Sequence, residues 1–292
     1  MIAPFGVGRY TPLGLVFLEI RPQKRVIHAM NLTDRDILRL RRAMSSAGTP
    51  EFFASFRRLL RARMPFATFI LIRFDPGKAP VMLDAWFVSK RLPSAALTEY
   101  LENTYPFDPF FQFRDLPAGG GLYRLPEIAP DRFFSSEYYL EYYRKTGLCD
   151  EVGLLAPLPT GGRAHLSLSR FEETGPYRRR EIQCLKHHAP LLLELLAQHV
   201  TAVSPQVAVA PPAAAPSIAD LIQVYAGDTL HVHLTRREAE IAALVLQGHS
   251  NGSAALSLNI ARETCKVHRR NLYRKLEISS QRDLFGLLKH LL

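Results

Sequence analysis

Residues 234–276 read LTRREAEIAALVLQGHSNGSAALSLNIARETCKVHRRNLYRKL, and this stretch decides how the chain is organised. Thr235, followed three residues later by Glu238, forms a capping box that predicts the start of a helix. Gly248 predicts the end of this helix, and Ser250 predicts the N-cap of a second one. A third helical pattern follows after a very short connection. The stretch therefore predicts three short helices joined by tight turns.

The third predicted helix, from about Arg262 to Leu276, has two different faces at 100° per residue. One stripe is expected to pack inward and consists of Cys265, Leu272 and Leu276. The opposite stripe is basic around one small apolar side chain and consists of Lys266, Val267, Arg270 and Arg274. A helix-turn-helix places its second helix in the major groove, where Lys and Arg donate to guanine and Val contacts a thymine methyl. We predict a DNA-reading face here; the alternative is a solvated basic face on an ordinary three-helix bundle.

Composition favours a globular protein of two domains. The chain has 292 residues, 47% of them apolar and 22% charged. A net charge of +10 favours a polyanionic partner. The three cysteines are scattered (Cys149, Cys184 and Cys265), which fits a reducing cytoplasm better than a disulfide framework. No spacing typical of a metal site is present, and neither a metal nor a cofactor is expected.

The first residues predict an N-terminal extension, residues 1–29, that is not necessarily native. Met30 precedes NLTDRD, a good helix start, and is an alternative initiator. The apolar run at residues 13–20 is too short to span a bilayer, so no membrane partner is expected.

A second boundary is predicted at residues 201–216, which read TAVSPQVAVAPPAAAP. This Ala- and Pro-rich segment has no charged residue and no helical or strand period, as in a semi-extended linker. It separates a predicted sensor domain, residues 30–200, from a predicted DNA-binding domain, residues 217–292. The latter is expected to be all-α, with four helices.

The region before the linker alternates helices and hairpins. Helices are predicted from Thr33, from Thr49, at 94–103, at 131–147 and at 176–200, the last one kinked at Pro190; paired strands are predicted at 66–74 with 81–88 and at 152–158 with 164–170. Hairpins imply an antiparallel sheet flanked by helices, so we predict an α+β sensor of the PAS/GAF kind. The Gly119-Gly120-Gly121 run is expected to be a loop.

Aromatic residues cluster in this region, and their simplest interpretation is core packing. The alternative is an apolar pocket in which a few polar groups orient a small molecule. The residues that we expect to contact such a ligand are Trp86, Tyr100, Tyr105, Asp108, Phe111 and Tyr139.

Four spaced motifs resemble the LuxR-type helix-turn-helix over residues 234 to about 288: Leu234-Thr-x-Arg-Glu, Gly248-x-Ser-Asn, Thr264-x-Lys-x-His and Leu272-Tyr-x-Lys-Leu. The resemblance implies that Lys266, Val267 and Arg270 reach base edges and that Thr264 contacts phosphate. It also implies a dimer contact through a last helix at 280–292, by way of Leu284, Leu287 and Leu288. The alternative for this last helix is that it covers the three-helix core.

The chain departs from the LuxR-type pattern at two places. Gly252-Ser253 replaces the usual Lys-Glu, which weakens the second helix, and Cys265 replaces a Val. We expect Cys265 to be an inert core residue.

The pattern Tyr100-x4-Tyr105-x2-Asp108-Pro109 is similar to the Tyr…Tyr…Asp-Pro pattern of acyl-homoserine-lactone receptors, in which the Asp accepts from the ligand amide. Ala96 stands where these receptors have a Trp that donates to the lactone carbonyl. Its loss leaves a polar ligand group unpaired, at a cost of about 1–3 kcal/mol. We therefore expect a different small ligand. A quorum-sensing orphan receptor for a lactone is the alternative, followed by a domain without a ligand.

Together these features predict a cytoplasmic, ligand-responsive transcriptional regulator that binds double-stranded DNA as a homodimer at an inverted repeat. Contacts with the transcription machinery are a further expectation. A competing class is an enzyme, but the candidate acid–base groups have no supporting spacing: Asp150, Glu181, His187 and His188. A third class is an architectural protein that binds DNA with steep salt dependence and little sequence preference.

Overall fold

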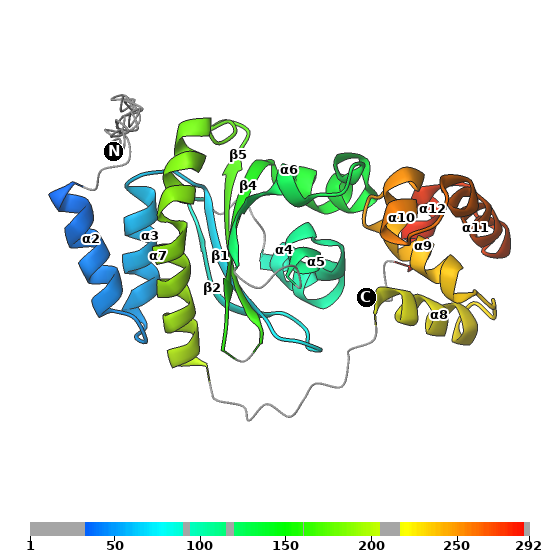
Figure 1. The fold of residues 1–292 in the computed structure, drawn as a ribbon, viewed down its shortest axis with the longest axis horizontal. Helices are drawn as coiled ribbons and strands as arrows, with labels where there is room; N and C mark the ends of the chain where they lie inside the picture. The colour runs from blue at the N-terminus through cyan, green and yellow to red at the C-terminus, as the bar shows by residue number, and fades with distance from the viewer. Residues whose placement is uncertain (1–32, 90–93, 115–119, 160, 205–216, 289–292) are drawn as a thin grey trace, which may run out of the picture. The chain divides into compact units, whose positions relative to one another are not determined.

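The computed structural model describes residues 33–89, 94–114, 120–159, 161–204 and 217–288. The predicted extension at residues 1–29 and most of the predicted linker lie outside these ranges. In Figure 1 a five-stranded sheet occupies the N-terminal region, with helices on both of its faces. The C-terminal region is helical, in agreement with the predicted fold class.

Every strand pairing in the sheet is antiparallel, and the strand order is β2-β1-β5-β4-β3. The strands are β1 (Thr68–Phe74), β2 (Val81–Phe87), β3 (Gly121–Arg124), β4 (Leu148–Pro157) and β5 (Arg163–Phe171). Both predicted hairpins, β1–β2 and β4–β5, are confirmed. Strand β3 was not predicted: Gly121, expected in a loop, begins it. A four-residue strand is too short to show a period.

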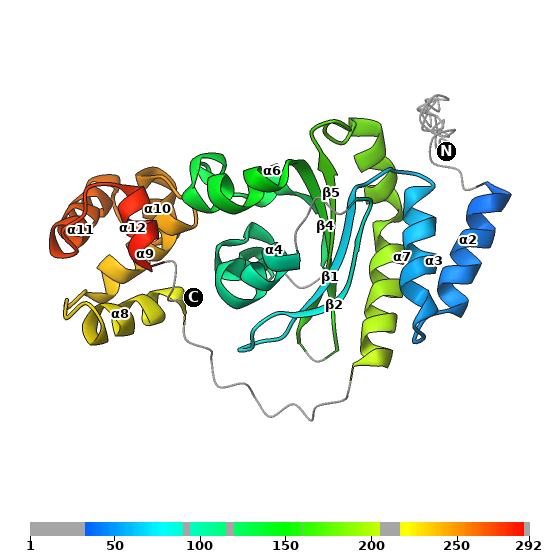
Figure 2. The ribbon, with the colours of Figure 1, turned by 180° about the vertical axis from the view of Figure 1, so that it is seen from behind.

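Three helices lie on one side of the sheet, with α2 outermost against α3, as Figures 1 and 2 show. They are α2 (Asp34–Ser45), α3 (Glu51–Arg61) and α7 (Arg179–Val203). Thr33 caps α2 in a capping box with Asp36, as expected for a Thr before early acidic residues. The buried side chains Phe69, Leu71 and Leu166 pack among these helices. Helix α7 continues to Val203, so the helix extends into the segment predicted as linker.

The other face of the sheet is covered by short helical segments: α4 (Ser94–Glu99), η1 (Tyr100–Thr104), η2 (Tyr105–Phe107), α5 (Pro109–Phe113), α6 (Leu125–Ile128), η3 (Phe133–Ser135), η4 (Tyr139–Tyr143) and η5 (Arg144–Thr146). One regular helix was predicted at 131–147. This prediction was wrong, because short π and 3₁₀ segments stand there instead. Gly147 ends this segment in the left-handed conformation, with φ of 73°.

The C-terminal region contains α8 (Ile218–Asp228), α9 (Arg236–Leu246), α10 (Asn251–Ser257), α11 (Arg262–Lys275) and α12 (Gln281–Leu288). The last four are the predicted helices. The capping box of Thr235 with Glu238 and the cap by Ser250 are both confirmed. Helix α8 is added before them, so the described part of this region has five helices instead of four. It packs against α9 through a buried face that includes Ile222 and Ala226.

Candidate functional site

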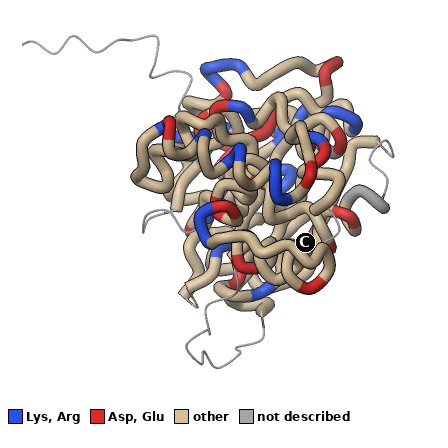
Figure 3. The backbone as a smooth tube through the Cα atoms, turned by 90° about the vertical axis from the view of Figure 1, so that its right-hand side faces the viewer, with Lys and Arg blue, Asp and Glu red and all other residues tan. Residues whose placement is uncertain are grey.

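The first candidate site is the outward face of α11. Every residue predicted to touch DNA is exposed on this helix: Thr264, Lys266, Val267, Arg270 and Arg274. The helix carries six Lys or Arg residues and one acidic residue, Glu263, so its outward face is strongly basic. Figure 3 colours the Lys and Arg positions of the chain blue along the backbone. Val267 exposes 44% of its surface, which leaves its methyl groups free to meet a thymine methyl.

The inward face of α11 fixes the helix in place. Cys265 and Leu272 are fully buried, and Leu276 is nearly so, as predicted for the packed stripe. Arg269 joins α11 to α10, because its guanidinium donates to Asn251 Oδ1 at 3.1 Å. Lys275 Nζ lies 2.7 Å from Glu238 Oε2 and so ties the end of α11 to the start of α9. The outward face of α11 is therefore held in place by packing, a hydrogen bond and an ion pair on its inner side.

The turn between α9 and α10 contacts residues 131–133 from the sheet-containing region. The Asp131 carboxylate accepts hydrogen bonds from Ser250 N at 2.9 Å and from Ser253 Oγ at 2.5 Å. Burial opposes ionisation of Asp131, but the bonds from the two serines outweigh it and lower its pKa to about 2. Arg132 N also donates to Gly248 O at 2.9 Å. One of these bonds is donated by Ser253, the residue that stands where the LuxR-type pattern has Glu.

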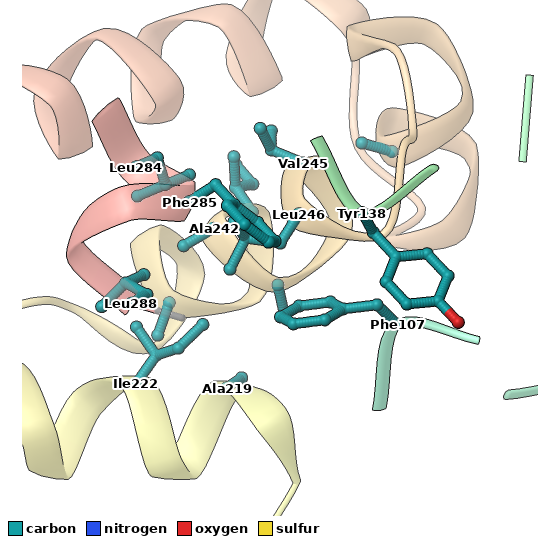
Figure 4. Packing of buried hydrophobic residues seen from close by; sticks show 14 of the residues in the cluster. Phe107, Tyr138, Ala219, Ile222, Ala242, Val245, Leu246, Leu284, Phe285 and Leu288 are labelled. Carbon is teal, nitrogen blue, oxygen red and sulfur yellow. The ribbon is translucent and has the colours of Figure 1, made fainter. Parts of the chain in front are cut away.

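Apolar packing continues this contact. Figure 4 shows Phe107 beside Phe285 of α12, with ring centroids 5.9 Å apart. Gly248 has φ of +93°, and a Cβ atom there would lie 2.7 Å from Cα of Phe133. Only glycine meets both requirements at this position. Phe133 thus lies directly on the helix-turn-helix turn.

The second candidate site is a cavity of about 130 Å³ on the face of the sheet opposite α7. Strand alternation directs Ile70, Ile72, Glu151, His165 and Ser167 toward it. Short helical segments close it with a further set of side chains: Tyr100, Asp108, Leu125, Phe133, Tyr138 and Tyr143. The lining is apolar, with a few convergent polar groups, as in small-molecule sites.

Two buried carboxyl groups line the cavity. Asp108 accepts from Tyr100 Oη at 2.6 Å and from Phe110 N at 2.9 Å. Glu151 accepts from Ser167 Oγ at 2.5 Å and from Tyr143 Oη at 2.8 Å. Burial raises the pKa of Asp108 to about 6 despite these donors. Burial, and then the charge of Asp108, raise the pKa of Glu151 to about 7.

His165 is the third buried polar group of the cavity. Its ring is stacked between Phe110, at 4.6 Å, and Phe74, at 5.4 Å. Neither ring nitrogen has a hydrogen-bond partner among the residues that the structure describes. Burial lowers its pKa to about 3, so the imidazole is neutral. The neutral His165 ring therefore has one hydrogen-bond donor and one acceptor without a partner among the described residues.

The structure brings some of the predicted ligand contacts together and separates others. Tyr100 and Asp108 line the cavity. Tyr105 and Phe111 pack against each other outside it, with ring centroids 4.7 Å apart. Tyr139 stacks on Tyr143 and does not line it.

Trp86 also lies away from the cavity. It pairs with Phe69 in the sheet and faces α3, where the guanidiniums of Arg57 and Arg61 lie 5.0 and 4.8 Å from its ring. Trp86 therefore contacts two guanidinium groups and does not line the cavity.

Sequence reasoning missed Glu151, His165 and Ser167. All three are polar residues within buried strands, where their neighbours Val152, Leu166 and Leu168 are fully buried on the other face. Polar positions repeating every second residue of an otherwise apolar strand were the available signal.

The acid–base candidates of the enzyme alternative do not converge. Asp150 is paired with Arg124 at 2.6 Å, and Glu181 is paired with Arg170 at 2.9 Å. The His187 and His188 rings are adjacent on α7 but nearly perpendicular. The two carboxylates are thus engaged in ion pairs.

Helix α12 packs into the helical core of the C-terminal region. Leu284 and Leu288 are fully buried in the helical core, and Leu287 is half-buried. This supports the alternative in which the helix covers the core. Across the described helices, none combines the length and apolar character needed to cross a membrane.

Comparisons with known proteins identify a family for the C-terminal region. Residues 232–287 match the family described as bacterial regulatory proteins, luxR family. A putative HTH-type transcriptional regulator in the exeN 3′ region of Aeromonas salmonicida is 32% identical over 188 residues, which cover 63% of this chain and 95% of the relative.

A search of solved structures finds similarity to two chains, among others. The LBD domain of VqsR from Pseudomonas aeruginosa has a TM-score of 0.51 and 21% identity, covering 59% of this chain and 100% of that domain. SdiA in complex with octanoyl-rac-glycerol has a TM-score of 0.44 and 18% identity, covering 90% of this chain and 97% of that one. The VqsR similarity shows a shared fold.

Proposed function

Because this chain belongs to the luxR family of bacterial regulatory proteins, we propose that it is a transcriptional regulator in which a small molecule controls a DNA-reading head. The observation that carries the DNA-reading part is α11. Its inward face is held by packing, one hydrogen bond and one ion pair, while its outward face presents Lys266, Val267 and Arg270 to solvent. In this proposal these three residues read base edges, and Thr264 and Arg274 contact phosphates.

Alanine variants of the reading face test this part. Lys266→Ala and Arg270→Ala should each weaken binding to a specific duplex by about 1–3 kcal/mol, because each removes a base contact. Arg180→Ala is the matched control, since it removes an exposed positive charge from α7, away from the reading face. Unchanged discrimination between specific and non-specific DNA in both α11 variants would sink the assignment.

The cavity is proposed to be the sensing site, and Phe133 is proposed to connect it to the head. Its side chain lines the cavity, and its backbone lies against Gly248 in the turn that precedes α10. A ligand that displaces Phe133 would therefore move Asp131 and Arg132, which hold that turn through hydrogen bonds. The outward face of α11 is already exposed. In this proposal the ligand therefore changes the position of the helix-turn-helix and does not uncover α11.

A search for bound molecules tests the sensing part. Native mass spectrometry of the purified full chain should reveal a small molecule whose removal changes DNA affinity. A cavity variant that no longer retains the molecule, yet responds like the wild type, would contradict the proposal.

We further propose that the regulator works as a cytoplasmic homodimer on an inverted-repeat site, with domains at residues 30–200 and 217–292 joined by the linker. Two-fold symmetry of a dimer supports this arrangement of half-sites. An acyl-homoserine lactone is the second candidate ligand, favoured by one observation: Tyr100 and Asp108, from the resembling motif, both line the cavity.

A further inference from the structure

The cavity has an unbalanced charge. Asp108 and Glu151 are both buried in its wall, and no Lys or Arg is among the described residues that line it. A buried carboxylate without a counter-charge is costly. Arg124 pairs with Asp150, whose neighbour Glu151 faces the opposite side of the strand.

Both carboxyl groups retain capacity to accept further hydrogen bonds. Each of the four oxygens accepts one hydrogen bond from the protein: Tyr100 and Phe110 N donate to Asp108, and Tyr143 and Ser167 donate to Glu151. Since a carboxylate offers about four acceptor sites, both groups can also accept from a ligand. The donors already present hold the carboxyl groups in place for that ligand.

His165 gives an independent reason to place a polar ligand in this cavity. It is 1% exposed, lines the same cavity, and has no hydrogen-bond partner on either ring nitrogen among the described residues. Buried polar atoms in proteins are ordinarily paired, so an unpaired imidazole in the wall of the cavity favours a ligand with a polar group. A purely apolar ligand would leave it unpaired.

We propose that the effector is a small organic cation, a protonated amine, whose ammonium group lies between Asp108 and Glu151. This inference rests on the proposed sensing function and specifies its ligand class. An ammonium group supplies three donors and the missing positive charge. Charge-assisted hydrogen bonds of this kind are about twice as strong as neutral ones.

The size of the cavity limits the rest of the molecule. An apolar cavity of about 150 Å³ holds one benzene ring. The cavity of about 130 Å³ is of this order, and its walls include Ile70, Ile72 and Leu125. The effector is therefore an amine with one compact apolar group of roughly this size, and not a long-chain molecule.

Three isosteric probes test the class on the full chain: benzylamine, benzyl alcohol and benzoate. Isothermal titration calorimetry on the wild type should show benzylamine binding at least tenfold more tightly than the other two. Glu151→Gln and Asp108→Asn should each weaken benzylamine at least tenfold, while the exposed matched control Glu194→Gln should leave it unchanged. Circular dichroism of each variant checks that it is folded.

The wild-type comparison decides the proposal without any variant. Tighter binding of the alcohol or the acid, or no binding of benzylamine, would overturn the amine class. An effector of another class that co-purifies and alters DNA affinity would leave ligand sensing standing. Failure of every bound molecule to alter DNA affinity would instead contradict the proposed function.

Discussion

At the residue scale, Glu151 makes stability depend on pH. Its pKa in the folded protein is raised from 4.5 to about 7, by burial and by the neighbouring Asp108. A group with a raised folded pKa contributes stability that is fully present below its unfolded pKa and is lost as pH rises through the folded value. The ligand-free wild type should therefore lose stability between about pH 5 and pH 8 through this group.

Glu151→Gln should flatten that profile, because an amide does not titrate. Chemical denaturation at pH 5 and pH 8 measures the difference in the free energy of unfolding for each protein. The other titratable groups around this carboxyl, Asp108, Tyr143 and Asp150, remain in the variant. Glu194→Gln serves as the control and should follow the wild type. Parallel profiles for the wild type and Glu151→Gln would rule out the buried ionisation.

The individual site residues were predictable in unequal degree. The reading face needed only helical periodicity and motif spacing, so all five predicted residues lie exposed on α11. Of the six predicted ligand contacts, Tyr100 and Asp108 line the cavity. Trp86 does not, because the strand parity of β2 directs it to α3, and parity depends on register that a hairpin sequence leaves open.

At the element scale, α10 is weakened by glycine. Gly252 lies near its start, and a Cβ atom there would meet only Ser250 Oγ at 3.4 Å, an ordinary contact. Alanine has a better helix propensity than glycine by about 1 kcal/mol. Gly252→Ala should therefore raise the free energy of unfolding by up to about 1 kcal/mol, measured by denaturant titration.

Gly248 gives the contrasting variant. It has a positive φ, and Phe133 backbone atoms lie within 3.0 Å of where a Cβ would be. Gly248→Ala should destabilise the protein, since the change adds both backbone strain and a clash. If Gly248→Ala and Gly252→Ala changed the free energy of unfolding equally, the turn at Gly248 would not be as tightly packed as the structure shows.

Element boundaries followed from local signals wherever a cap residue was present. Thr33, Thr235 and Ser250 all cap the helices they were predicted to begin. The region around the cavity was less predictable. Its π segments η1 and η4 lie where regular helices were predicted, at 94–103 and 131–147, because helical signals in a sequence do not distinguish a π or 3₁₀ turn from an α-helix.

At the scale of the whole molecule, the proposed coupling of the cavity to the DNA-binding head depends on the contact between residues 131–133 and the α9–α10 turn. Asp131→Ala removes two hydrogen bonds to this turn, from Ser250 N and Ser253 Oγ. Amide hydrogen exchange should become faster at Ser250 and Arg132, which donate across the contact. Loss of a hydrogen bond costs about 1 kcal/mol, so exchange should rise by roughly fivefold or more.

Glu172→Ala is the control, because it removes an exposed carboxylate elsewhere in the chain. It should leave exchange at Ser250 and Arg132 unchanged. If Asp131→Ala also leaves both amides protected, the contact does not hold the head, and a route through Phe133 is excluded. This contact could not be predicted, because it joins residues 119 positions apart in the sequence. The sequence shows that Gly252-Ser253 departs from the LuxR-type pattern. It does not show that Ser253 would bond to Asp131.

The most direct test of the central claim, that α11 reads DNA sequence, is selection from a randomised duplex library. The wild-type chain should enrich one inverted-repeat motif, and Arg270→Ala should relax the preference at a single position of each half-site. Arg180→Ala should enrich the wild-type motif. Enrichment of no motif by the wild type, or of an unaltered motif by Arg270→Ala, would contradict the account.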